Sequence, residues 1–143
     1  GKIVMEIGEL SEFKREICGS ERRSETVLIG GLPWKIMAKI KEEYIIKKDV
    51  CLYLCCAAPN EKNWSCKFSA TIRIVSQNSG TECLKKKFRE LRLNNKANSC
   101  ELFSFPCRVF WGTNHEHNAF YNINNSLTVE IEVILARKSV KFI

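Results

Sequence analysis

The residues best suited to metal binding or acid–base chemistry are two histidines in a polar segment. His115 and His117 lie within 112–118, whose Gly, Thr, Asn and Glu residues are typical of a turn. A His-x-His pair can bind a metal ion when strand geometry turns both rings to the same side. A solvated loop is the simpler interpretation of this segment, and we expect neither a metal nor a cofactor.

A hydrolytic triad would require a nucleophile, a base and an orienting carboxylate within hydrogen-bond reach of one another. Ser11, Glu12 and Asp49 offer a hydroxyl and two carboxylates, but no spacing relates them to either histidine. The Gly-Gly segment at 30–33 lacks the later Gly and Lys of a phosphate-binding loop. We therefore predict that the domain is not an enzyme.

Eight cysteines among 143 residues could indicate a disulfide scaffold, but their positions favour reduced thiols. Several lie in apolar, strand-like segments, where a free thiol behaves as a small hydrophobic side chain. No pair has the Cys-x-x-Cys spacing of a structural zinc site. Because the chain is long enough to bury a core without disulfides, we expect a cytoplasmic or nuclear protein. The cysteines in apolar segments are Cys51, Cys55, Cys56 and Cys66.

The densest positive charge lies at Lys85–Arg92, in a chain with 23 Lys and Arg against 16 Asp and Glu. Such a segment could contact phosphates, but only Phe88 is available within it to stack on a base. The surrounding stretch 83–93 fits either a short helix or an irregular edge strand. We interpret it as a solvated or partner-facing edge and keep nucleic-acid binding as the weaker alternative.

The elements that must position these residues are mainly β-strands in which apolar and polar side chains alternate. One face is apolar and the other polar, as in an antiparallel sheet packed on a second sheet. The strand-like segment 51–56 is apolar on both faces, so its outer face must be covered or used. No apolar run approaches the roughly 18 residues of a membrane span. We therefore predict one all-β domain over 1–143, an antiparallel sandwich of about seven or eight strands. Alternation is clearest at 3–7, 34–40, 66–75 and 127–135.

Several motifs follow one another in an order that covers nearly the whole chain. The most specific is Ile29–Met37, which contains Gly-Gly-Leu-Pro-Trp. The others are Lys2–Phe13, Leu52–Cys56, Asn63–Cys66, Ala70–Ile74 and Ala119–Glu130. Together they resemble the MATH (meprin and TRAF homology) domain family. The cysteine content is similar to that of the expanded MATH and BTB-MATH families of nematodes.

This resemblance implies an eight-stranded antiparallel sandwich with a shallow groove for short linear peptide segments of partner proteins. Family members often act as substrate adaptors, joined by flanking domains to a cullin-type ubiquitin ligase or to a deubiquitinase. Because this sequence contains no trimerising coiled coil, we expect a monomer rather than a trimer. A scaffold or oligomerisation domain with a degenerate groove stays open as an alternative.

Groove residues carry over from the resemblance only in part. Tyr53 matches a groove aromatic, whereas Phe68 matches another but alternates in phase with apparent core residues. After Asn98, many relatives have Asp-Trp-Gly-Phe, and the loss of that Trp here removes a large contact. Glu101 then suggests Lys or Arg in the bound peptide. The candidate peptide-binding residues are Tyr53, Phe68, Ser99, Cys100, Glu101, Leu102 and Phe103.

Overall fold

The computed structural model describes the chain outside 44–46, 59–62, 77–81, 108–125, 137–140 and 143. Within these described residues there are ten strands and one helix of four residues. No helix in this part of the chain is long and apolar enough to cross a membrane. The elements are β1 (Lys2–Ile7), α1 (Leu10–Phe13), β2 (Glu21–Arg23), β3 (Val27–Ile29), β4 (Leu32–Glu43), β5 (Lys47–Cys56), β6 (Trp64–Ser76), β7 (Glu82–Asn94), β8 (Ser99–Pro106), β9 (Leu127–Leu135) and β10 (Lys141–Phe142).

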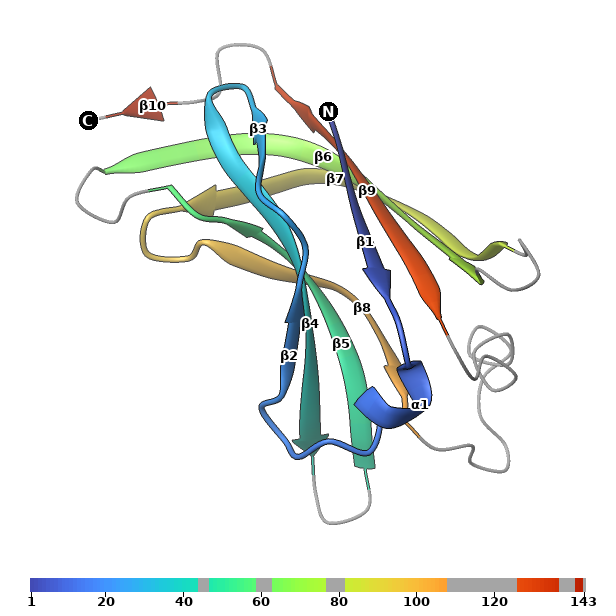
Figure 1. Ribbon diagram of the computed structural model, residues 1–143. Helices are drawn as coiled ribbons and strands as arrows, with labels where there is room; N and C mark the ends of the chain where they lie inside the picture. The colour runs from blue at the N-terminus through green and yellow to red at the C-terminus, as the bar shows by residue number, and fades with distance from the viewer. Residues whose placement is uncertain (44–46, 59–62, 77–81, 108–125, 137–140, 143) are drawn as a thin grey trace.

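Two antiparallel sheets form the layers of a sandwich (Figure 1). The first sheet has the order β1-β9-β6, with β7 and β10 also paired to β6. The second has the order β2-β4-β5-β8, with β3 paired to β4. The predicted antiparallel sandwich is therefore confirmed. The seven longer strands agree with the seven or eight that alternation predicted. With β2, β3 and β10, short pieces of two or three residues, the described residues contain ten strands, where the resemblance implied eight.

The core lies between the sheets, where the alternating apolar side chains of each strand meet. On β4 the inward residues Trp34 and Ile36 are fully buried, and on β6 the same holds for Ile72. The rings of Trp34 and Phe68 meet edge to face, with centroids 5.1 Å apart, and so join the two sheets. Each such buried side chain contributes about 1.5–3 kcal/mol to folding, which makes this alternation the main source of stability.

A tight turn between β3 and β4 positions Trp34. Gly30 and Gly31 have φ values of +59° and +79°, a left-handed conformation that side chains with a Cβ rarely adopt. The turn pairs Ile29 with Leu32. It also allows the indole Nε1 of Trp34 to donate a hydrogen bond to the carbonyl of Ile29 at 3.2 Å. The Gly-Gly segment therefore has a structural role in anchoring the core.

β7 is an irregular edge strand, which settles the choice left open for residues 83–93. It pairs with β6 alone among the described strands, and its register shifts twice along that pairing. One shift lies opposite Phe68 and Ala70, where Glu90 has a φ of +56°. Such bulges increase strand twist and interrupt the regular ladder, which hinders further pairing at that edge.

Candidate functional site

β8 forms the edge of the second sheet at the side where the chain crosses from one layer to the other. In the part of the chain that the structure describes, it pairs only with β5. β7 and β8 lie along the same side of the sandwich and are joined by the short turn at 95–98 (Figure 1). An edge strand presents unpaired backbone N–H and C=O groups, which can pair with a strand from another chain.

A bulge in β8 determines which of its side chains face outward. Leu52 pairs with Phe103, but the next residue, Tyr53, pairs with Glu101, so Leu102 is the extra residue. Leu102 and Phe103 are consecutive yet both buried, 6% and 7% exposed. As a result, Glu101 lies on the outer face of the sheet, directly opposite Tyr53.

Tyr53 is half-buried at the centre of this outer face. Its neighbours in register are Met37 on β4 and Glu101 on β8. The Lys41 ammonium lies 5.9 Å from the centre of the Tyr53 ring and 3.8 Å from Oε1 of Glu101. Hydrogen bonding to Tyr53 raises the pKa of Lys41, and the negative charge of Glu101 adds to this effect. Lys41 thus already compensates the carboxylate of Glu101, which weakens the expectation of Lys or Arg in a bound peptide.

Thiols flank Tyr53 on the same face of β5. Cys51 and Cys55 are 3% and 8% exposed. Burial raises the pKa of Cys51 to about 12, with a further contribution from the nearby charge of Glu101. Burial likewise raises the pKa of Cys100 to about 11. These thiols therefore stay protonated at neutral pH and act as small apolar side chains, not as nucleophiles.

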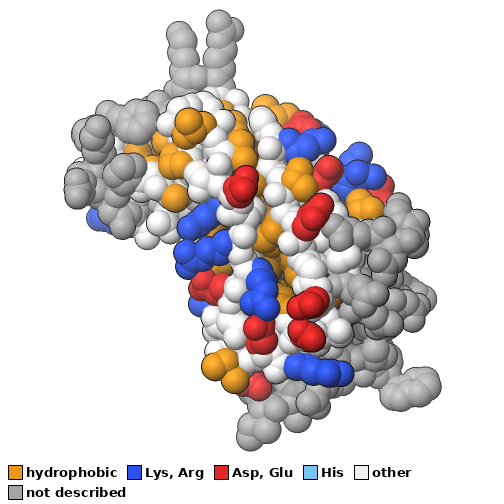
Figure 2. Space-filling model, viewed as in Figure 1, with side chains coloured by type: hydrophobic (Ala, Val, Ile, Leu, Met, Phe, Trp, Pro, Cys, Tyr) orange, Lys and Arg blue, Asp and Glu red, His pale blue; other side chains and the backbone are white. Residues whose placement is uncertain are grey.

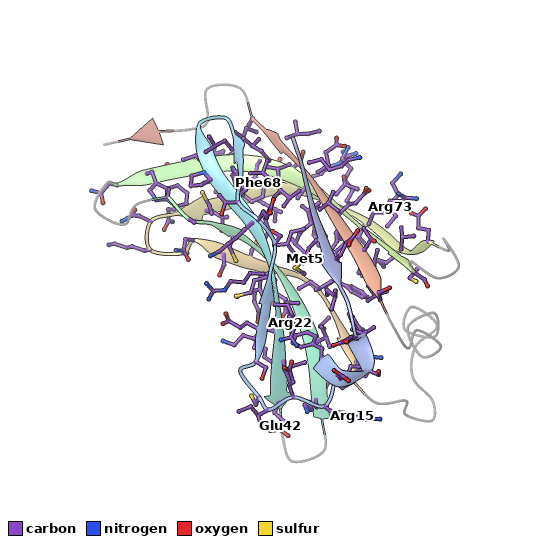
Figure 3. The ribbon with its side chains drawn as sticks, viewed as in Figure 1. Met5, Arg15, Arg22, Glu42, Phe68 and Arg73 are labelled. Carbon is purple, nitrogen blue, oxygen red and sulfur yellow. The ribbon has the colours of Figure 1, made fainter. Side chains whose placement is uncertain are left out.

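Six of the seven candidate residues lie on the neighbouring strands β5 and β8, but only Tyr53, Ser99 and Glu101 share the outer face. Ser99 and Glu101 are exposed on β8, close to half-buried Tyr53. Phe68 belongs to β6 of the other sheet, is 2% exposed, and lies between the sheets (Figure 3). It is thus part of the core, as its alternation with Ala70 and Ile72 indicated, and not the groove residue that the resemblance implied. Cys100 is half-buried, and Leu102 and Phe103 contribute mainly to the core.

Sequence reasoning missed the contribution of β7 to this site. Leu84, Phe88 and Leu91 are only partly buried against the core. The Lys86 ammonium lies 5.3 Å from the centre of the Phe103 ring, so a side chain of β7 contacts one of β8 in the other sheet. The i, i+4, i+7 spacing of these hydrophobic residues was compatible with a helix. The bulges of β7 interrupt the regular alternation by which a strand is recognised in a sequence.

The outer face of the first sheet carries mixed charges. Arg73 lies 3.5 Å from Glu130 and 3.6 Å from Glu82, beside a shallow hollow of about 510 Å³. Figure 2 shows positive and negative side chains interspersed over the face in view. Around Arg73 this compensation makes phosphate binding unfavourable, because affinity for nucleic acid depends on many uncompensated cations.

No metal centre emerges from the described residues. They contain no group of three or more His, Cys, Asp and Glu side chains placed to hold an ion. His115 and His117, the pair considered for metal binding, lie outside the described residues. None of the eight cysteines is in a disulfide.

Comparison with known protein families gives one match, and it spans the β8 edge. The family model for the MATH domain matches residues 7–135. A search of the curated proteins finds no match. The matched range includes β2 to β9, and therefore both sheets, the β8 edge and Tyr53.

Proposed function

Because the chain belongs to the MATH domain family, whose members are generally protein-interaction modules, we propose that it binds short linear peptide segments along β8. The observation that carries this proposal is the edge position of β8, with half-buried Tyr53 beside it on the outer face. MATH domains are typically noncatalytic, and the raised thiol pKa values at this site fit a binding role.

Binding would proceed by strand addition. An extended peptide can form backbone hydrogen bonds with the outer edge of β8 while its alternate side chains face opposite sides of the sheet. Tyr53 offers a rigid aromatic contact with little conformational entropy to lose, as at many interaction hot spots. Ser99 and Glu101 supply exposed polar groups next to it. The bulge at Leu102 places Glu101 on the same outer face as Tyr53.

The cellular role that we propose is recruitment of substrates to ubiquitin-pathway machinery through flanking domains. The domain would act as a monomer in the cytoplasm or nucleus. Four buried cysteines, none of them in a disulfide, support a reducing compartment, since oxidising compartments favour disulfides. Peptide binding at β8 can be tested independently of any role in the ubiquitin pathway.

Selection from a library of random peptides, followed by calorimetry on the enriched sequences, tests the groove. We expect Tyr53→Ala to weaken binding at least about tenfold, because a hot-spot truncation costs more than about 1.4 kcal/mol. Val4→Ala is the matched control: Val4 is 47% exposed on the outer face of the other sheet. Equal affinities for Tyr53→Ala and the parent chain would overturn the proposal. Unfolding of Tyr53→Ala at normal temperatures would instead assign Tyr53 to the core.

A further inference from the structure

β7 carries a row of lysine and arginine side chains on the outer, solvent-facing side of the first sheet. Lys85 and Lys87 pair with β6 residues that alternate with buried ones and therefore face outward. All four cations of the row are exposed, and none of them forms an ion pair within the part of the chain that the structure describes. The row consists of Lys85, Lys87, Arg89 and Arg92.

The bulge in β7 brings the last of these cations onto the same face. Phe88 and Leu91 are three residues apart, yet both pair with buried residues of β6, so an extra residue lies between them. Without that residue, Arg92 would point to the opposite face from Lys87, because successive side chains of a strand alternate. The bulge instead pairs Arg92 with exposed Lys67. The row is thus extended past the irregularity.

The carboxylates near the row leave it with an excess of positive charge. Glu82, at the start of β7, forms an ion pair with Arg73 at 3.6 Å. At the Lys85 end, the hollow of about 510 Å³ is lined by three carboxylates and three cations. Glu90 is exposed at the bulge and, together with Arg92, lines a second hollow of about 310 Å³. One exposed carboxylate against four cations makes this face attractive to an anionic partner.

The spacing of the row fits an extended acidic peptide. Alternate residues of a strand lie about 6.6–6.8 Å apart, and the side chains on one face of an extended peptide repeat at the same interval. Alternate Asp or Glu side chains of such a peptide can therefore each face one cation. The distance from Lys85 to Arg92 is about 20 Å, which six or seven extended residues span.

A peptide fits this surface better than a nucleic acid does. Phe88, the one aromatic residue of β7, packs against the core, so the row has no ring on which a base could stack. A phosphate backbone is charged at every nucleotide and would bring a phosphate against Glu90. A peptide can place a neutral residue at that position.

We propose that the outer face of β7 binds an extended acidic segment of a partner protein, whose Asp or Glu side chains contact the four cations of the row. The contact is made by side chains, because the bulges of β7 hinder strand addition at its backbone. Tyr53 lies on the outer face of the other sheet. This surface is therefore distinct from the β8 groove, and the inference does not rest on the proposed function.

An NMR titration of the full chain tests this surface and locates the bound peptide. The probes are three eight-residue peptides with blocked ends, in which Ser alternates with Glu, with Gln or with Lys, and an oligothymidylate with four phosphates, which matches the charge of the Glu peptide. At low ionic strength the Glu peptide should shift the amide signals of 82–94 and bind at least about tenfold more tightly than the Gln peptide. The Lys peptide should bind most weakly. Added NaCl should weaken binding of the Glu peptide, since salt screens exposed charges.

Two double variants separate the row from the net charge of the chain. Lys87→Gln with Arg92→Gln should weaken binding of the Glu peptide at least about fivefold. Lys35→Gln with Lys39→Gln is the matched control: it removes the same charge from β4 in the other sheet and should change the affinity less than about twofold. Circular dichroism should show both variants folded, because surface substitutions change stability little.

Four outcomes would overturn the inference. Equal affinities for the Glu and Gln peptides would show that the carboxylates do not matter, and equal losses in the two double variants would reduce the effect to net charge. Shifts centred on 99–106 would place the peptide on β8. Tighter binding of the oligothymidylate than of the Glu peptide would assign the row to nucleic acid.

Discussion

Replacement of Trp34 by Ala is the sharpest test of how this sandwich is held together. Trp34 is fully buried, contacts the Phe68 ring of the opposite sheet at 5.1 Å between centroids, and donates its indole hydrogen bond to Ile29. The substitution therefore removes a large apolar group, an aromatic contact between layers and the partner of a buried carbonyl. All three changes destabilise the native state.

The expected loss can be worked from these contacts. Truncation of a buried Trp to Ala costs about 3–5 kcal/mol through lost burial and the resulting cavity. An orphaned buried carbonyl adds about 1 kcal/mol or more. We therefore expect Trp34→Ala to lower the free energy of unfolding by about 4–6 kcal/mol, a large fraction of the roughly 5–15 kcal/mol typical of a domain. The melting temperature should fall by more than about 10 °C.

Urea unfolding followed by far-ultraviolet circular dichroism measures this loss without reliance on tryptophan fluorescence. Trp34→Phe is the matched control: it keeps a ring against Phe68 but cannot donate to Ile29, and it should cost about 1–2 kcal/mol. A loss below about 1.5 kcal/mol for Trp34→Ala would refute the reasoning, because the cavity term alone should exceed it. Equal losses for both variants would assign the effect to the hydrogen bond and not to packing.

Two further predictions concern the turn and the thiols. Gly30→Ala should cost about 1–3 kcal/mol in thermal melts, because Gly30 has a φ of +59° and a Cβ there would overlap the side chain of Leu135. Gly8→Ala is the matched control. Since no atom lies within 4 Å of a Cβ added at Gly8, this substitution should change stability by less than about 0.5 kcal/mol. Burial raises the pKa of the Cys51 thiol from 9.0 to about 12, so the unfolded chain holds fewer protons above about pH 9, and stability should fall from there toward pH 12. Urea unfolding at about pH 8 and about pH 10.5 checks this sign, and equal stability at both would contradict it.

Local alternation was enough to predict most of the sandwich. On β4, Trp34, Ile36 and Ala38 are buried as their spacing indicated, because each strand presents one face to the opposite sheet. The apolar outer face of 51–56 also pointed to a covered or functional surface. The structure covers that face in part with Lys41 and leaves Tyr53 half-buried.

The structure of β7 could not be predicted in the same way. A bulge inserts an extra residue between Phe88 and Leu91, so both reach the same face three residues apart, a spacing that no regular strand has. Such spacing is equally compatible with a helix. Only the pairing with β6, a long-range contact, decides between the two structures. The same limit applies to Lys86, whose contact with Phe103 joins separate sheets.

The bulge in β8 has a cause that the sequence contains. If the pairing of Leu52 with Phe103 continued without an extra residue, Tyr53 would face Leu102, and Glu101 would point into the core with Phe103. Burial of an unpaired carboxylate costs several kcal/mol, more than the disruption of one ladder position. The extra residue instead returns Glu101 to the outer face, where Lys41 can reach it. The charge of Glu101 thus selects the register, and that register places the polar edge of the groove beside Tyr53.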